Sequence, residues 1–543
     1  MKMPNKISTV ASSSARSIRT NVAEVLLRGG TYRSLEQQRL SPMEEKFETI
    51  RRVSGFILAP LGFLAMMIIP EGMDPTQQKI AAVLVGVILL WLCETLPIPV
   101  TGLFGVGLLV VIGAAPASEV LAPFGSTTIF TFIGAFILAQ AMLKHGVAQR
   151  LAFFVLGLPG VGNSTVRIIL AFGGITCVLS AFVSNTATVA MLLPTALGIL
   201  TVIAQLMQDK GIVKEDFDPL RLRVGAALML MLAYGASIGG LLTPVGAPPN
   251  LIGRGLIEEA TGIRISFGQW VMTALPICIC MMVALTVILF IVNRPETRRI
   301  EGVAEFVTEH KKQQGRMSRA EINTIIAFSI TVFLWIFPAI LGIFVGVDSA
   351  IYEAVDERLN EGIVAVLGAV LLFLLPVESK KLKYTLDWSD AAKIDWGTII
   401  LFGCGMIFGA MLGNSGLAES IGSGLNSMLG VSSAVVITGM AVLLAILISE
   451  TTSNTAAAAV TVPIVVPLAI AAGIDPVIPA MAATFGASFG FMLPISTPQN
   501  AIVYGSGCVS IARMIRTGIS FDIIGGALIV FFLPTVATMV GIG

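Results

Sequence analysis

The segment 180-SAFVSNTATVAMLLP-194 decides the fold, because it recurs as 449-SETTSNTAAAAVTVP-463 at an offset of 269 residues. In both copies a Ser stands four residues before a Ser-Asn-Thr-Ala motif, and a Pro follows it. Each copy lies in an apolar segment of about 40 residues, 165–204 and 432–472. A straight helix of that length would reach about 60 Å, twice the thickness of a bilayer core. Each segment is therefore expected to fold back on itself as a re-entrant hairpin.

The composition indicates that the rest of the chain also lies in a membrane. Hydrophobic residues make up 55% of the sequence and charged residues only 12%, against about 25% charged in soluble domains. Because a backbone in lipid must satisfy its own hydrogen bonds, the apolar spans are expected to be helices. We predict eleven spans of suitable length, at 53–70, 79–97, 98–115, 126–144, 222–254, 269–293, 322–346, 360–376, 397–413, 476–504 and 517–541. The expected fold is an all-α polytopic membrane protein with about eleven transmembrane helices and two re-entrant hairpins.

A second pair of landmarks extends the repeat. Gly235-Ala236-Ser237 recurs as Gly486-Ala487-Ser488, and Pro248 and Asn250 recur as Pro498 and Asn500. Prolines in both regions are expected to break the helices 222–254 and 476–504 and to free carbonyl oxygens at mid-membrane. Five expected crossings separate the two Ser-Asn-Thr motifs, and an odd number reverses orientation. The repeats are therefore expected to be inverted, an arrangement that places a substrate site near the midplane of many carriers.

The loop charges predict the orientation. Lys and Arg mark cytoplasmic loops, and the loop 294–321 is basic while 347–361 is mainly acidic. This pattern puts the N-terminus in the cytoplasm and the C-terminus outside, in the inner (plasma) membrane of the cell. Residues 1–52, with ten Lys or Arg, are expected to form a cytoplasmic arm.

Several classes of function are disfavoured. The net charge of +1 argues against a nucleic-acid partner, and the absence of a GxxxxGK[ST] phosphate loop argues against ATP as a direct energy source. Two histidines and six scattered cysteines offer no metal framework. No constellation of nucleophile and base stands out, so the chain is not expected to be an enzyme.

The two motifs have the chemistry of an anion site. A bend at each motif is expected to open a helix from Ala187 and from Ala456, with its N-terminal amides directed at the midplane. Side chains of the motifs can add hydrogen bonds, and one motif for each carboxylate suits a two-headed anion. The alternative is that Ser, Asn and Thr only cap and pack helices; two copies in matching positions make this reading weaker. Glu450, beside the second motif, is a further candidate because intramembrane carboxylates are often functional, although a structural role is the plainer interpretation.

The Ser-Asn-Thr pair, the two Pro-x-Asn loops and the run 488-SFGFMLP-494 through 500-NAIV-503 resemble the divalent anion/sodium symporter family over about residues 53–543. That resemblance implies a homodimer in which a transport domain moves as an elevator against a scaffold domain. It also implies two sodium sites and a substrate site at the hairpin tips. The first sodium site would comprise Ser180, Ser184, Asn185 and the backbone of Gly246, and the second Ser449, Ser453, Asn454 and the backbone of Ser496. The substrate site would comprise Ser184, Asn185, Thr186, Ala247, Pro248, Ser453, Asn454, Thr455, Thr497 and Pro498.

The resemblance divides the chain into parts. Scaffold helices are expected at 53–146 and, with linkers, at 269–413, and the two halves of the transport domain at 147–268 and 414–543. The expected function is sodium-coupled uptake of a C4-dicarboxylate such as succinate, malate or fumarate. Gln499, where the first loop has a second proline, and Ser496, where a smaller residue is usual, leave substrate choice open. A dicarboxylate exchanger, a sulfate or citrate carrier of the same fold and a passive channel are the alternatives.

Overall fold

The computed structural model of the chain describes residues 42–68, 73–209, 222–296, 303–346, 349–421, 424 and 433–542. Most of the expected N-terminal arm, residues 1–41, lies outside the described residues, as does the connector 210–221. The last residues of that expected arm, 42–52, are helical, because the first described helix begins at Pro42.

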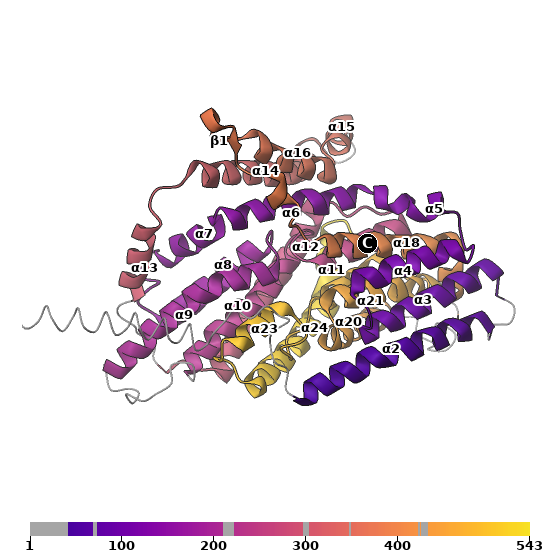
Figure 1. Ribbon diagram of the computed structural model, residues 1–543, viewed down its shortest axis with the longest axis horizontal. Helices are drawn as coiled ribbons and strands as arrows, with labels where there is room; N and C mark the ends of the chain where they lie inside the picture. Colours follow the sequence, from indigo (N-terminus) through magenta and orange to yellow (C-terminus); the bar gives the residue numbers. More distant parts are fainter. Residues whose placement is uncertain are drawn as a thin grey trace, which may run out of the picture.

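The described residues are mostly helical (Figure 1), as the sequence predicts. The helices of the first half are α2 (Pro42–Ile68), α3 (Pro75–Cys93), α4 (Ile98–Val111), α5 (Ala117–Leu121), the 3-10 helix η2 (Ala122–Gly125), α6 (Thr127–Lys144), α7 (Val147–Leu156), α8 (Thr165–Ser180), α9 (Asn185–Asp209), α10 (Arg223–Leu241) and α11 (Pro248–Thr261). Those of the second half are α12 (Phe267–Val292), α13 (Val303–Gln313), α14 (Arg319–Val345), α15 (Ala350–Arg358), α16 (Glu361–Leu374), the 3-10 helix η4 (Ser379–Lys381), α17 (Trp388–Ala391), α18 (Trp396–Asn414), α20 (Ala434–Thr451), α21 (Asn454–Ala471), α22 (Val477–Gly486), α23 (Pro498–Gly505) and α24 (Ile511–Met539). A single small antiparallel pair of strands, β1 (Pro376–Glu378) and β2 (Lys383–Tyr384), completes the described elements.

Eleven described helices are long and apolar enough to cross a membrane, by length and composition. They are not the same eleven that the sequence predicts. Helices α9, α20 and α21, which are arms of the two hairpins, reach the required length. Three predicted spans do not, because α4 and α16 have only 14 residues each and the span 476–504 is divided into α22 and α23, of 10 and 8 residues. Length and hydropathy therefore do not separate a hairpin arm from a full crossing.

Both expected hairpins and both expected broken helices are present. Helices α8 and α9 form the first hairpin and α20 and α21 the second. The first broken helix comprises α10 and α11, with the loop Leu242–Ala247 between them, and the second comprises α22 and α23. The prolines act as expected, because each second half begins at a proline, Pro248 or Pro498, whose missing N–H is not needed at the first position of a helix.

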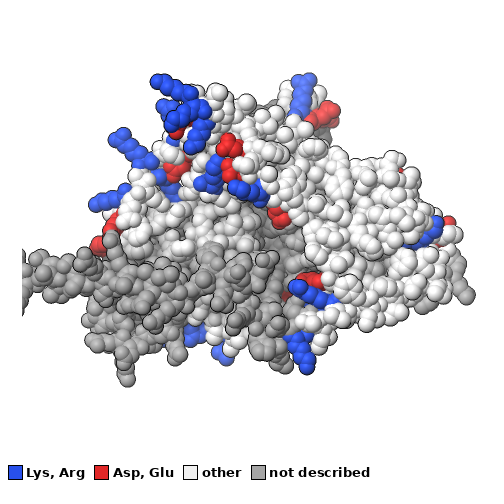
Figure 2. Space-filling view, viewed as in Figure 1, with Lys and Arg blue, Asp and Glu red and all other residues white. Residues whose placement is uncertain are grey.

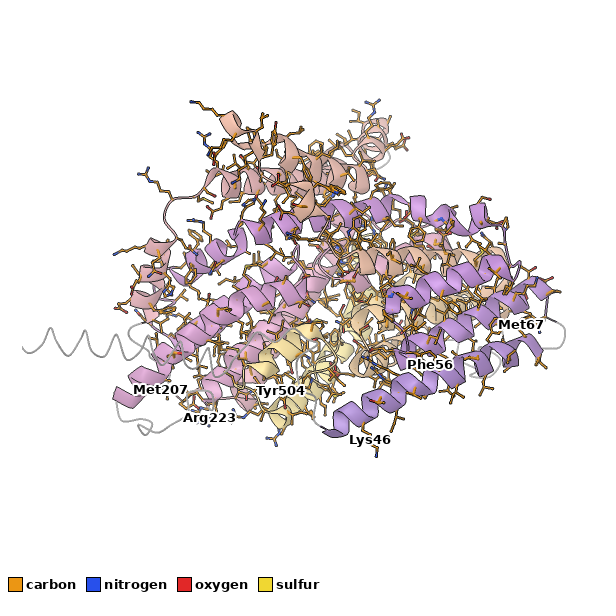
Figure 3. The ribbon with its side chains drawn as sticks, viewed as in Figure 1. Lys46, Phe56, Met67, Met207, Arg223 and Tyr504 are labelled. Carbon is orange, nitrogen blue, oxygen red and sulfur yellow. The ribbon has the colours of Figure 1, made fainter. Side chains whose placement is uncertain are left out.

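The two repeats interlock. Helix α9 of the first hairpin packs on α23 of the second broken helix, and α21 of the second hairpin packs on α11 of the first broken helix. Each hairpin is thus held by its own broken helix, mainly along its first arm, and by the other repeat along its second arm. In Figure 3, Met207 and Arg223 lie at the neighbouring ends of α9 and α10.

Glycines bring the remaining helices into close contact. A Cβ on Gly134 of α6 would lie 2.3 Å from the carbonyl carbon of Ala365 in α16, and one on Gly368 of α16 would lie 1.9 Å from Oγ1 of Thr331 in α14. Only glycine allows such an approach. Helices α6, α14 and α16 therefore form one tightly packed unit.

The outer surface suits a lipid environment. Phe56 of α2 is 61% exposed and points away from the rest of the protein, and Met67 lies further along the same helix (Figure 3). Basic side chains gather over the region of β1 and α13, while much of the remaining visible described surface is uncharged (Figure 2). This distribution is what a multi-pass membrane protein requires.

Candidate functional site

The hairpin tips expose helix N-termini, but these begin two residues earlier than the sequence predicts. Helix α9 starts at Asn185 and α21 at Asn454, not at Ala187 and Ala456. The reason is capping: Ser184 Oγ accepts a hydrogen bond from the Ala187 N–H at 3.3 Å, and Ser453 Oγ accepts one from the Ala456 N–H at 3.2 Å. Each motif therefore forms the cap and first turn of its helix, where the dipole favours an anion.

A cluster of oxygen atoms lies behind the first tip, and we call it the first cradle. Ser180 Oγ donates to Asn185 Oδ1 at 2.6 Å. A Cβ on Gly240 would lie 2.6 Å from that same Oδ1, and one on Gly246 would lie 2.6 Å from the Gly240 carbonyl oxygen and 3.0 Å from that of Ala181. Glycine at both positions thus lets hydroxyl, amide and carbonyl oxygens lie close together.

The second tip has a matching arrangement, the second cradle. Ser449 Oγ donates to Asn454 Oδ1 at 2.8 Å and is also placed 2.8 Å from the Ala487 carbonyl oxygen. A Cβ on Gly490, the counterpart of Gly240, would lie 3.1 Å from Asn454 Oδ1. Ser496 occupies the position of Gly246 and is buried. Both cradles therefore combine a Ser, an Asn and a glycine-lined loop.

These cradles fit a hard cation. Such ions prefer carbonyl, hydroxyl and amide oxygens, which are the groups that both cradles bring together. No group of three or more His, Cys, Asp or Glu that could hold a metal occurs among the described residues. The donor atoms thus suit sodium and do not suit zinc or another transition metal.

One asparagine in each loop clamps the break in its helix. Asn250 Nδ2 donates to the carbonyl oxygens of Gly240 at 2.6 Å and Thr243 at 2.8 Å. Asn500 Nδ2 donates in the same way to Gly490 at 2.7 Å and Leu493 at 3.1 Å. The freed carbonyls of each break are thereby held in place, which gives the repeated Pro-x-Asn pattern a structural reason.

Glu450 connects the second hairpin to the loop of the second cradle through three hydrogen bonds. Its Oε1 accepts hydrogen bonds from the amides of Phe491 at 2.6 Å and Met492 at 2.8 Å, and its Oε2 accepts one from Ser496 Oγ at 2.7 Å. The side chain thus anchors the loop of the second cradle to the hairpin. The first repeat has Ala181 at this position and achieves the link differently, because Thr243 Oγ1 donates to the Ala181 carbonyl oxygen.

Exposure divides the candidate site residues into an accessible set and a buried set. Ser184 and Pro498 are exposed, and Asn185, Thr186, Pro248, Ser453, Asn454 and Thr455 are half-buried. Ser180, Gly246, Ser449 and Ser496 are buried behind them. Ala247 and Thr497 are buried as well, and Thr497 Oγ1 accepts a hydrogen bond from the Asn500 N–H as the cap of α23. The accessible layer is thus formed mainly by the motifs, and the cradles lie beneath it.

Gln499 joins the two repeats. Its Nε2 donates to Ser237 Oγ of α10 at 3.0 Å, although the two residues are 262 positions apart. A proline, as at position 249, could not make this contact. The sequence marks Gln499 as a departure from the repeat, but its partner could not be read from the sequence.

The fold and site define a membrane transporter of inverted repeats. A family model described as the sodium:sulfate symporter transmembrane region matches residues 52–542, so the chain belongs to this family of divalent anion/sodium symporters. The proteins of this family that resemble the chain are named as transporters and not as enzymes.

Curated relatives and a solved structure agree with this assignment. The chain is 32% identical to the sodium-dependent dicarboxylate transporter SdcS of Staphylococcus saprophyticus over 498 residues, covering 90% of this chain and 93% of that protein. It is 30% identical to SdcS of Staphylococcus aureus over 490 residues, covering 90% and 91%. The solved structure of Neisseria gonorrhoeae MtrF, at 14% identity, has a TM-score of 0.50 and covers 94% of this chain and 97% of that one. At 14% identity, the similarity to MtrF shows the fold alone.

Proposed function

We propose that this protein is a secondary active transporter that couples sodium to the uptake of a C4-dicarboxylate such as succinate, malate or fumarate. The observation that carries the proposal is the pair of matching cradles behind two capped helix N-termini. The dependence on sodium and the dicarboxylate class named for the SdcS proteins support it. The family description, sodium:sulfate symporter, makes sulfate the second candidate substrate.

The chain's own groups suggest how a dianion is held without a basic side chain. One carboxylate meets the helix end and side chains of Asn185 and Thr186, and the other meets those of Asn454 and Thr455. Two cations in the cradles, through Ser180, Ser184, Asn185 and the Gly246 backbone and through Ser449, Ser453, Asn454 and the Ser496 backbone, would offset two negative charges. This neutralisation matters because a bare dianion is very costly to move through a low-dielectric region.

Movement completes the proposal. The parts 147–268 and 414–543 carry the site and act as the transport domain, which moves as an elevator against scaffold helices in 53–146 and 269–413. The protein is proposed to work as a homodimer in the inner membrane, with the N-terminus in the cytoplasm and the C-terminus outside.

Uptake by proteoliposomes tests the function. Radiolabelled succinate should accumulate under an inward sodium gradient and not when choline replaces sodium. Asn185→Ala and Asn454→Ala should each raise the apparent KM for succinate at least about tenfold, since each removes a charge-assisted contact to a carboxylate. The exposed Asn414→Ala is the matched control and should behave like wild type. Succinate uptake that is indifferent to sodium, or sodium-driven uptake of radiolabelled sulfate with none of succinate, would reject the proposal. Succinate counterflow in the complete absence of sodium would identify an exchanger.

A further inference from the structure

A buried ion pair joins two parts of the protein that are distant in sequence. Arg254 Nη1 of α11 lies 2.6 Å from Glu361 Oε2 at the start of α16, and the two side chains are only 3% and 9% exposed. Glu361 Oε1 accepts a second hydrogen bond, from the Phe267 N–H at 2.6 Å. The carboxylate is therefore fully engaged, and the pair is shielded from water.

Each partner is fixed firmly to its own surroundings. Gly253, next to Arg254, approaches α22 so closely that a Cβ would lie 1.9 Å from Thr484 Oγ1. Gly362, next to Glu361, approaches α6 so closely that a Cβ would lie 2.2 Å from the Thr127 carbonyl oxygen. Arg254 is thus part of the packed body that contains the broken helices, and Glu361 is part of the unit formed by α6, α14 and α16.

The contact that flanks this pair is apolar. Where α11 meets α18, a Cβ on Gly255 would lie 2.7 Å from the ring of Phe402, and one on Gly409 would lie 2.9 Å from Leu256 Cδ2. Glycines facing rings and methyl groups make a smooth surface that has no directional bonds. The buried ion pair is different, because its hydrogen bond forms at only one relative position of the two helices. Leaving one of its charges buried without a partner is costly.

We infer that Arg254 and Glu361 are positioning residues that hold the transport domain in the position seen here, as a latch that has to open in every transport cycle. This inference rests on the proposed division into a transport domain and a scaffold. Helix α11 begins at Pro248, directly after the first cradle, and Arg254 lies about 9 Å further along it, at 1.5 Å per residue. Opening the latch therefore frees the helix that carries the cradle loop.

Crosslinking measures how often the latched position is occupied. The variant Leu256→Cys with Gly409→Cys places two thiols in contact across α11 and α18 only in this position. Adding Arg254→Gln or Glu361→Gln should slow crosslinking by mercury or copper-phenanthroline at least about tenfold, because one buried charge loses its partner. Arg254→Lys, which keeps the charge, should recover part of the rate.

The matched control is a second ion pair that also joins the proposed transport domain to the proposed scaffold. Arg264 lies 3.7 Å from Asp356 of α15, but both side chains are about one-third exposed. Arg264→Gln should change the rate less than about twofold, since exposed pairs contribute little. The ratio of the apparent KM values for succinate at the two membrane faces should shift in Arg254→Gln and Glu361→Gln and not in Arg264→Gln. A loss of general stability alone would leave this ratio unchanged.

The outcomes separate the inference from the proposed function. Wild-type crosslinking and an unchanged KM ratio in folded Arg254→Gln and Glu361→Gln would overturn the latch while sodium-driven uptake stands. If the wild-type protein takes up no dicarboxylate, the proposed substrate is rejected. If Arg254→Gln and Glu361→Gln nevertheless crosslink more slowly, the latch is retained. If the single variants do not fold, Arg254→Gln combined with Glu361→Gln leaves no buried charge. A wild-type crosslinking rate in this double variant would then overturn the latch.

Discussion

Replacing Glu450 with alanine should damage the second cradle by an amount that the structure allows us to work out. The change removes the acceptor of the Phe491 and Met492 amides, while Ser496 Oγ can still donate to the Glu450 backbone carbonyl oxygen at 3.0 Å. The buried Phe491 amide and the half-buried Met492 amide then lose their acceptor, each at a cost of up to about 1–3 kcal/mol. The ordered loop should thus be destabilised by about 2–6 kcal/mol. Glu450→Gln keeps one acceptor oxygen and should destabilise the loop less.

The assay is thermal unfolding in detergent across a sodium titration. If the loop forms part of a sodium site, Glu450→Ala should raise the sodium concentration for half-maximal stabilisation at least about tenfold, since a tenfold change corresponds to about 1.4 kcal/mol. Glu419→Ala, a change at an exposed acidic residue, is the control and should leave the midpoint unchanged. An unaltered midpoint in Glu450→Ala would refute the reasoning, and so would an equal loss of stability with and without sodium.

Three further predictions concern other positions. Gly240→Ala should abolish sodium-dependent uptake because its Cβ would lie 2.6 Å from Asn185 Oδ1, whereas Gly174→Ala in α8 of the first hairpin, with nothing within 4 Å, should be tolerated. Equal uptake by the two variants would contradict the first cradle. Asn500→Ala should lower the free energy of unfolding by about 2–4 kcal/mol, because the buried Gly490 carbonyl and the half-buried Leu493 carbonyl each lose a hydrogen bond. A melting-temperature shift no larger than that of Asn414→Ala would disprove this prediction. Hydrogen bonds from Lys144 and then Lys393 hold the pKa of Asp390 below its usual range, so this stabilisation is present above the unfolded-state pKa and is lost as the pH falls below about 4. Asp390→Asn should flatten the acid side of a melting-temperature profile, and an unchanged slope there would count against the contact.

The fold was predictable because its signals are local and repeated. The 269-residue offset identified both hairpins, and the prolines at 248 and 498 identified both breaks. Helix starts were predicted less well, since Ser184 and Ser453 cap their helices earlier than the alanine runs suggested. The total of eleven long apolar helices agreed only numerically, because hairpin arms pass the same length test as full crossings.

The candidate site was predictable where the repeat applies and not where it fails. The family resemblance grouped Ser180 with Asn185 and Ser449 with Asn454, and the structure joins each pair by a hydrogen bond. Glu450 replaces Ala181 in the pattern, and no spacing indicates that its partners lie 41 to 46 residues away. The pair Arg254 and Glu361 is 107 residues apart and depends on how helices pack, which no local pattern records.

The interlocking of the repeats has a consequence for biogenesis. During synthesis, α9 enters the bilayer long before α23 exists, so its Ser-Asn-Thr tip has only part of its final support until about residue 505 has been made. The nascent first half should therefore remain a substrate for membrane proteases or insertion chaperones until the second half arrives. Two separately expressed halves should rescue each other only when they meet in the same membrane, since each supplies the surface on which the other's hairpin rests.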